Sequence, residues 1–138
     1  MSNFKKHVTV GAAVAGGANL AWQLCKILDD PNRPKDFWDF LGRIDFFQIA
    51  AFGFVGAACA ALPDMLEPAN NPNHRAVFHS LACGAAVTYG AFGKHTQNLS
   101  PDEKHALRVA ALSYLSHLAL DSGTPKGLPI AGLPVIDI

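Results

Sequence analysis

Residues 46–62 read FFQIAAFGFVGAACAAL, a stretch without a single Asp, Glu, Lys or Arg. Three further stretches, 8–24, 76–92 and 106–120, have a similar length and composition, and among these four residue types they contain only Arg108. Each stretch is too long and too rich in alanine for a β-strand, so we predict four helices. The sequence therefore predicts an all-α fold, a compact up-and-down bundle of four apolar helices.

The last of these helices has clear start and stop signals. Ser100 can cap its first turn, Pro101 suits the first helical position, and Glu103 completes the pattern of a capping box. Gly123 and Pro125 follow its end, where a helix is expected to stop. We predict that this helix begins close to Pro101.

The composition favours a membrane location for the four helices. Charged residues make up 16 % of the chain, against roughly 25 % in soluble domains. A membrane span needs about 20 apolar residues, and aromatic residues between Phe37 and Phe47 resemble an interfacial belt. We predict transmembrane helices, with residues 1–138 forming a single helical membrane domain. A soluble four-helix bundle stays open as an alternative, because Asn19, Gln48 and His79 lie within the apolar stretches.

The N-terminal segment also has features of a secretory signal, because Lys5 and Lys6 precede an apolar stretch. No good small-x-small cleavage site follows near Ala21, and His7 lies at the edge of the stretch. We therefore expect this segment to be retained as the first helix.

Several classes of function lack support in the sequence. The formal net charge is zero, so we expect no nucleic-acid partner. The chain contains no GxSxG motif, no P-loop and no GxGxxG motif before a strand, so it has no motif of a serine hydrolase, an NTP-binding protein or a Rossmann fold. Its three cysteines form no CxxC pair, and we expect them to be small buried apolar residues.

The placement of the six histidines is the main clue to function. If four consecutive antiparallel helices are threaded up and down, most of the histidines and several carboxylates arrive at one end, with His74 close by. His95 and His105 fall at the opposite end. Five candidate metal ligands converge at the first end: His7, Asp64, His79, His117 and Asp121.

Helical spacing supports part of this set. His117 and Asp121 are four residues apart, so both side chains can point at one ion. An ordinary hydrogen-bonded pair remains an equal alternative for these two residues. His74 and His79 are five residues apart and cannot both face one ion from a regular helix, so we expect His79 to be the inward group. Ser113, one turn before His117, could support the site or merely pack.

The residue types indicate which metal the site would prefer. Imidazole and carboxylate ligands together suit a divalent transition metal, with zinc as the first choice and manganese or iron as alternatives. Arg75 lies near the predicted start of the third helix, where it could hold a phosphate or serve as an ordinary surface charge or interfacial anchor.

Three ordered motifs in this chain resemble the YdjM-like family. They are Leu62-Pro63-Asp64, then His74-Arg75-Ala76-Val77-Phe78-His79-Ser80, and Ser116-His117-Leu118-Ala119-Leu120-Asp121 leading into Thr124-Pro125-Lys126-Gly127-Leu128-Pro129. His7 would match the early histidine of that family. Two positions differ from its pattern: Leu66 replaces the second Asp of PDxD, with Glu67 next to it, and Phe78 replaces a Thr.

The resemblance implies a membrane-bound, metal-dependent hydrolase with a distant similarity to zinc-dependent phospholipases C. Some members of that family are under LexA control, and the family implies a bacterial inner membrane and a multi-pass arrangement. Membrane lipid and a small-molecule or lipid substrate would be its partners, and an oligomer is compatible with the sequence.

Two functions follow from this reasoning. In the first, the five ligands hold one or two metal ions, which activate water for attack on a phosphoester or lipid-like substrate. Glu67 or His74 transfers protons, and Arg75 neutralises the negative charge that develops in the reaction. In the second, the same cluster is a structural metal site in a non-catalytic membrane protein. An open coordination position favours the first function and a closed shell favours the second.

Overall fold

A computed structural model describes residues 2–68, 77–123 and 128–130 of the chain. These residues form helices and connecting segments and contain no β-strand. The all-α prediction is therefore confirmed. The elements in chain order are α1 (Ser2–Asp29), α2 (Phe37–Gly42), α3 (Phe46–Leu66), α4 (Leu81–Phe92), the 3₁₀ helix η1 (Lys94–Asn98) and α5 (Pro101–Ser122).

The predicted helix boundaries hold where a capping signal is present. Ser100 accepts from the Glu103 N–H and the Glu103 side chain accepts from the Ser100 N–H, so the predicted capping box begins α5. The third helix differs, because α4 begins only at Leu81, with Ser80 as its N-cap. The Leu81 and Ala82 N–H groups donate to backbone carbonyls of the C-terminal segment that includes Pro129.

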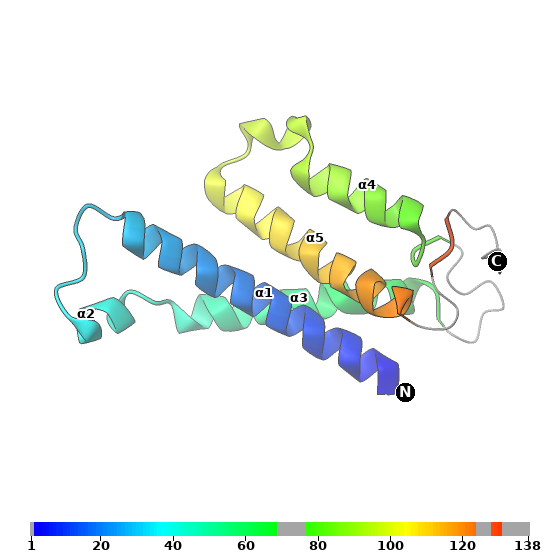
Figure 1. Ribbon diagram of the computed structural model, residues 1–138, viewed down its shortest axis with the longest axis horizontal. Coiled ribbons are helices and arrows are strands. Elements are labelled where there is room, and N and C mark those ends of the chain that lie inside the picture. The colour runs from blue at the N-terminus through cyan, green and yellow to red at the C-terminus, as the bar shows by residue number, and fades with distance from the viewer. Residues whose placement is uncertain (1, 69–76, 124–127, 131–138) are drawn as a thin grey trace.

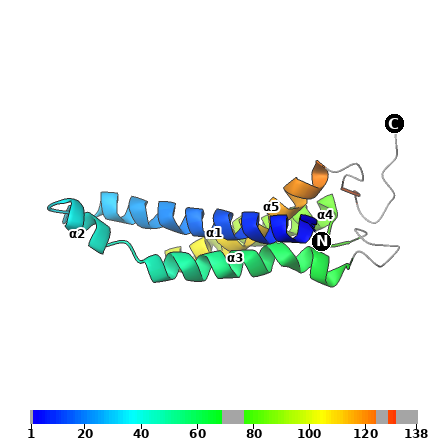
Figure 2. The same ribbon diagram turned by 90° about the horizontal axis from the view of Figure 1, so that it is seen from below.

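The helices form a bundle with a three-helix core. Helices α1, α3 and α5 pack against one another, and α4 lies mainly along α5 (Figures 1 and 2). The chain runs up and down through α1, α3, α4 and α5, as predicted (Figure 1). The expected compact packing of all four helices is thus present only in part, because α4 lies at the side of the core.

Glycine allows α1 and α3 to cross closely. A Cβ atom on Gly11 would lie 2.3 Å from the Ala60 Cβ, and one on Gly56 would lie 2.3 Å from the Ala15 Cβ. Both separations are far shorter than van der Waals contact, so no larger residue fits without movement of the helices. By contrast, a Cβ on Gly17 would meet nothing within 4 Å.

Two helices are long and apolar enough to cross a membrane, α1 over Phe4–Asp29 and α3 over Phe46–Leu66. Only 22 % of the residues in the apolar window of each helix are buried, whereas the core helix of a soluble protein is mostly buried. Helix α4 has 12 residues, so at 1.5 Å per residue it is roughly 18 Å long and shorter than the roughly 30 Å of a bilayer core. Four complete spans are therefore not apparent.

The three cysteines are free thiols. Cys25 is exposed, and Cys59 and Cys83 are half-buried. The expectation that all three are buried is wrong; Cys83, on α4 at the side of the core, is half-buried although its Sγ lies 3.2 Å from the Tyr114 hydroxyl of α5.

Candidate metal centre

Five side chains meet where α1, α3 and α5 come together beside the turn that precedes α4. Four of these side chains are almost fully buried, with exposed fractions of 3 % or less, and the Asp64 side chain is 24 % exposed. We call these five residues the metal cluster: His7 of α1, Asp64 of α3, His79 of the turn, and His117 and Asp121 of α5.

Two overlapping groups of three side chains could each hold a metal ion, one formed by His7, His117 and Asp121 and the other by Asp64, His79 and His117. The His79 Nε2 lies 3.3 Å from the Asp64 Oδ1 and 3.6 Å from the Asp121 Oδ2. The His117 Nε2 lies 3.8 Å and 3.4 Å from the same two oxygens. Ligand atoms about 2.1 Å from a tetrahedral zinc ion would be separated by about 3.4 Å. The spacing between these protein atoms therefore fits a transition-metal ion.

A backbone carbonyl sets the protonation of the His117 ring. The His117 Nδ1 lies 2.7 Å from the Ala60 carbonyl oxygen, which can only accept a hydrogen bond, so Nδ1 carries the hydrogen. In the neutral ring, Nε2 then has a lone pair directed at the two carboxylates. This buried nitrogen makes no hydrogen bond. A lone pair buried in this way is suited to a metal ion.

For His79, the partner of Nδ1 is a carboxylate and not a backbone carbonyl. The His79 Nδ1 lies 3.2 Å from the Glu67 Oε2, an arrangement typical of histidines that bind metal through Nε2. Glu67 also accepts hydrogen bonds from the backbone N–H groups of Val77, Phe78 and His79. The Tyr114 hydroxyl donates to the Phe78 carbonyl from the other side. Together these contacts hold the turn that carries His79.

Burial and hydrogen bonding act in opposite directions on the pKa of Glu67. Burial raises this pKa, but hydrogen bonds from the backbone N–H groups and the His79 ring outweigh it, so the pKa lies below its usual range. Burial also lowers the pKa of His79, although the Glu67 carboxylate opposes this. A neutral His79 ring is the form that binds metal.

His7 contacts the opposite side of the metal cluster. Its Nε2 lies 3.3 Å from the Asp121 Oδ1, the oxygen that does not face His79 and His117. Its ring stacks on the His117 ring with 3.9 Å between centroids, and its Nδ1 makes no hydrogen bond. His7 can therefore orient Asp121 or provide a ligand for a second ion that shares this carboxylate.

The structure brings together all five predicted metal ligands. Glu67, predicted to move protons, has its carboxylate occupied by the turn around His79. His74 and Arg75 lie outside the described residues. Ser113 donates to the Val109 and Gly11 carbonyls, so of its two predicted roles it has the packing one.

Sequence reasoning missed two partners of the site. The Ala60 carbonyl is a main-chain group on a small residue, and no side-chain pattern identifies it. Tyr114 lies on α5 one turn before the His117 segment, and only the path of the turn brings Phe78 to it.

None of the known family models matches this chain. Comparison with curated proteins and with solved structures also gives no significant match.

Proposed function

We propose that this chain is a membrane-bound, metal-dependent hydrolase that acts on a phosphoester or lipid-like substrate. The observation that carries the proposal is the pair of overlapping histidine and aspartate groups that share the buried His117, with Asp64 as their most exposed member. The three motifs behind the resemblance to the YdjM-like family contribute Asp64, His79 and the pair His117 and Asp121 to these groups. Zinc is the metal we favour, because it accepts this mixture of ligands in a tetrahedral arrangement.

The location in a membrane is part of the proposal. Large apolar side chains on α3 are exposed, among them Phe47 at 84 % and Phe54 at 78 %. Large exposed apolar patches are rare on soluble monomers. Lipid contact accounts for these side chains, and a bacterial inner membrane and a multi-pass arrangement follow from the resemblance.

In this proposal, different residues of the chain have different roles in hydrolysis. A bound transition-metal ion would act as a Lewis acid toward a phosphoryl or carbonyl oxygen. The Glu67 carboxylate and the Ala60 carbonyl face the Nδ1 atoms of His79 and His117, so Nε2 is the nitrogen of each ring that would bind a metal ion. Asp64, the most exposed member of the metal cluster, lies where a substrate can approach. His74 and Arg75 are our candidates for proton transfer and for neutralising negative charge.

A structural metal site is the second candidate function. A shell of four protein ligands is the pattern of structural zinc, and the metal cluster has enough histidines and carboxylates to supply one. Leu66, where the family has a second Asp, is 53 % exposed and contributes nothing to the metal cluster.

The first experiment measures the metal content of the detergent-extracted protein together with hydrolysis of bis-p-nitrophenyl phosphate and of a p-nitrophenyl ester. We expect at least one equivalent of a transition metal per chain. The variants His117→Ala and Asp121→Ala should lose both metal and turnover while they are expressed normally. His95→Ala is the matched control, because His95 is exposed and, among the described residues, hydrogen-bonds the Gly90 carbonyl alone.

The outcomes separate the two candidate functions. Turnover that persists without metal contradicts the hydrolase proposal. Metal that is bound by the wild type and lost in His117→Ala, without turnover on any substrate tested, favours the structural site. Metal content at background in every variant contradicts both.

A further inference from the structure

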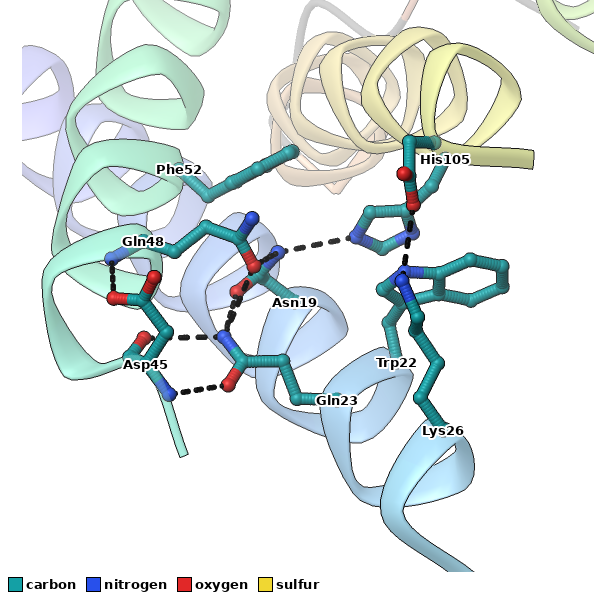
Figure 3. Close-up of a pocket in the computed structure, with 9 residues that line it drawn as sticks. Asn19, Trp22, Gln23, Lys26, Asp45, Gln48, Phe52 and His105 are labelled. Carbon is teal, nitrogen blue, oxygen red and sulfur yellow. Dashed lines mark hydrogen bonds and ion pairs between the residues drawn. The ribbon is translucent and has the colours of Figure 1, made fainter. Parts of the chain in front are cut away.

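A second polar site lies at the other end of the same three helices, at the far end of α1 from His7. His7 and Asn19 are 12 residues apart on α1, which corresponds to roughly 18 Å along a helix. A cavity of about 300 Å³ opens there, at the lower limit of the usual range for ligand pockets. We call it the far-end pocket, and its inner wall consists of Asn19, Trp22, Gln23, Gln48, Phe52 and His105 (Figure 3).

Hydrogen bonds fix the orientation of every amide in the far-end pocket. The Asp45 backbone N–H donates to the Gln23 Oε1, so the Gln23 Nε2 must be the donor to the Asn19 Oδ1. The Asn19 Nδ2 then donates to the Gln48 Oε1 and to the His105 Nε2. The chain of hydrogen bonds therefore runs in one direction, from a backbone N–H to the His105 ring.

This direction determines which groups remain available to a ligand. His105 accepts at Nε2, so its ring is neutral and the hydrogen lies on Nδ1. The Gln48 Oε1 accepts from both Asn19 and Gln23, which leaves the Gln48 Nε2 as a donor turned away from those amides (Figure 3). Neither the His105 Nδ1 nor the Gln48 Nε2 bonds any residue in the part of the chain that the structure describes. The inner wall therefore has N–H donors, and a ligand that binds there should carry hydrogen-bond acceptors.

The shape and charge of the pocket narrow the ligand further. Trp22 stacks on the His105 ring with 4.7 Å between centroids, the tilted Phe52 ring lies 5.2 Å from the same ring, and the Lys26 ammonium lies 5.8 Å from the Trp22 centroid, so the wall is aromatic. At the exposed mouth, the Lys26 ammonium is already paired with Asp102 at 3.3 Å. The Asp45 carboxylate caps α3. An anion would meet both carboxylates without an unpaired cation, so a neutral ligand fits better.

We propose that the far-end pocket binds a neutral, flat ring that carries carbonyl oxygens, as the headgroup of a quinone does. The carbonyl oxygens accept from the Gln48 Nε2 and the His105 Nδ1, and the ring packs against the aromatic wall. This proposal does not depend on the metal cluster, because the two sites share helices but no side chains.

Duroquinone is a suitable probe, because its ring is fully substituted and reacts slowly with the exposed Cys25 thiol. The chain has two tryptophans, so Trp38→Phe leaves Trp22 as the single fluorescent reporter in the pocket. Trp38, which is 76 % exposed, is the single reporter in Trp22→Phe and measures collisional quenching. We expect duroquinone to quench Trp22 saturably. Durene, which has the same shape without the oxygens, should not compete.

Gln48→Glu is the decisive variant. It keeps the Oε1 that accepts from Asn19 and Gln23 but replaces the Nε2 donor with an acceptor, so we expect affinity for duroquinone to fall at least tenfold. Gln97→Glu makes the same change at an exposed position outside the pocket and should leave affinity unchanged.

Thermal denaturation provides a second measurement that does not depend on fluorescence. Duroquinone should raise the melting midpoint of the wild type and of Gln97→Glu but not that of Gln48→Glu. Linear quenching that is equal for Trp22 and Trp38, or equal affinity in Gln48→Glu and the wild type, would overturn the proposal.

Discussion

Helices α1, α3 and α5 meet at both ends of the molecule, and the polar groups that they bury there have opposite requirements. In the metal cluster, the Nε2 atoms of His79 and His117 face two carboxylates. In the far-end pocket, the Gln48 Oε1 and the His105 Nε2 already accept hydrogen bonds, so the Gln48 Nε2 and the His105 Nδ1 carry hydrogen. One end therefore requires a cation, and the other requires a hydrogen-bond acceptor.

A single main-chain group determines this difference at each end. The Ala60 carbonyl takes the Nδ1 hydrogen of His117, so the opposite nitrogen is a lone pair. The Asp45 N–H orients Gln23, and the resulting chain of amides makes His105 an acceptor at Nε2 and a donor at Nδ1. The same residue type thus has opposite roles, because the first partner in each network is a different backbone group.

Metal removal should have the largest effect, and only on the metal cluster. With free zinc at one hundred times its dissociation constant, binding to the folded state alone stabilises it by about 2.7 kcal/mol. We expect chelation to lower the free energy of unfolding by about that amount in the wild type, measured by denaturant titration with and without zinc. Asp121→Asn should show little dependence on zinc. A wild type that is equally stable in chelator and in zinc would contradict the assignment.

Glu67→Gln tests whether the hydrogen bonds that Glu67 accepts from the His79 turn support metal binding. The amide keeps the shape of the side chain but loses the charge that accepts three backbone N–H groups and the His79 ring. Loss of such an outer partner typically lowers metal affinity about 10–100-fold. Competition with a chelating dye measures the change, and Glu103→Gln at the exposed start of α5 is the control. Unchanged affinity in Glu67→Gln would mean that the turn is held by other contacts.

Gly56→Ala should disturb the crossing that joins the two ends of the molecule. The added methyl group would lie 2.3 Å from the Ala15 Cβ and 2.5 Å from the Gly11 carbonyl oxygen. Overpacking of this kind costs about 1–3 kcal/mol. A methyl group added at Gly17 would have no neighbour within 4 Å beyond the adjacent helix backbone, so Gly17→Ala should instead stabilise the helix by up to about 1 kcal/mol. If chemical denaturation gives the two variants equal stability, the close crossing is wrong.

The smallest effect concerns the connection between α1 and α3 at the far end. A hydrogen bond from Arg43, aided by the Lys35 N–H, lowers the pKa of the half-buried Asp39. Its folded pKa lies below the unfolded value of about 3.9, so its contribution is present above that pH and is lost as the pH falls through the folded pKa. Asp39→Asn should therefore melt slightly below the wild type at pH 7 and equally at pH 2. A difference that grows on acidification would contradict this sign.

Much of the architecture could be predicted from particular residues. The apolar stretch 46–62 lies within α3, and the signals at Ser100 and Glu103 locate the start of α5. The start of α4 could not be predicted, because Glu67 and Ser80 hold residues 77–80 in a turn and delay the helix to Leu81. Contacts between distant segments overrode the local helix propensity there.

The sequence by itself determined that the chain forms helices and that His7, Asp64, His79, His117 and Asp121 can share one end, because up-and-down connectivity follows from the order of the apolar stretches. Only the tertiary structure decided which nitrogen of each ring faces its site. That choice depends on main-chain groups such as the Ala60 carbonyl and the Asp45 N–H. Every residue type except proline carries both groups, so no pattern of side chains can reveal which of them a distant histidine or amide will meet.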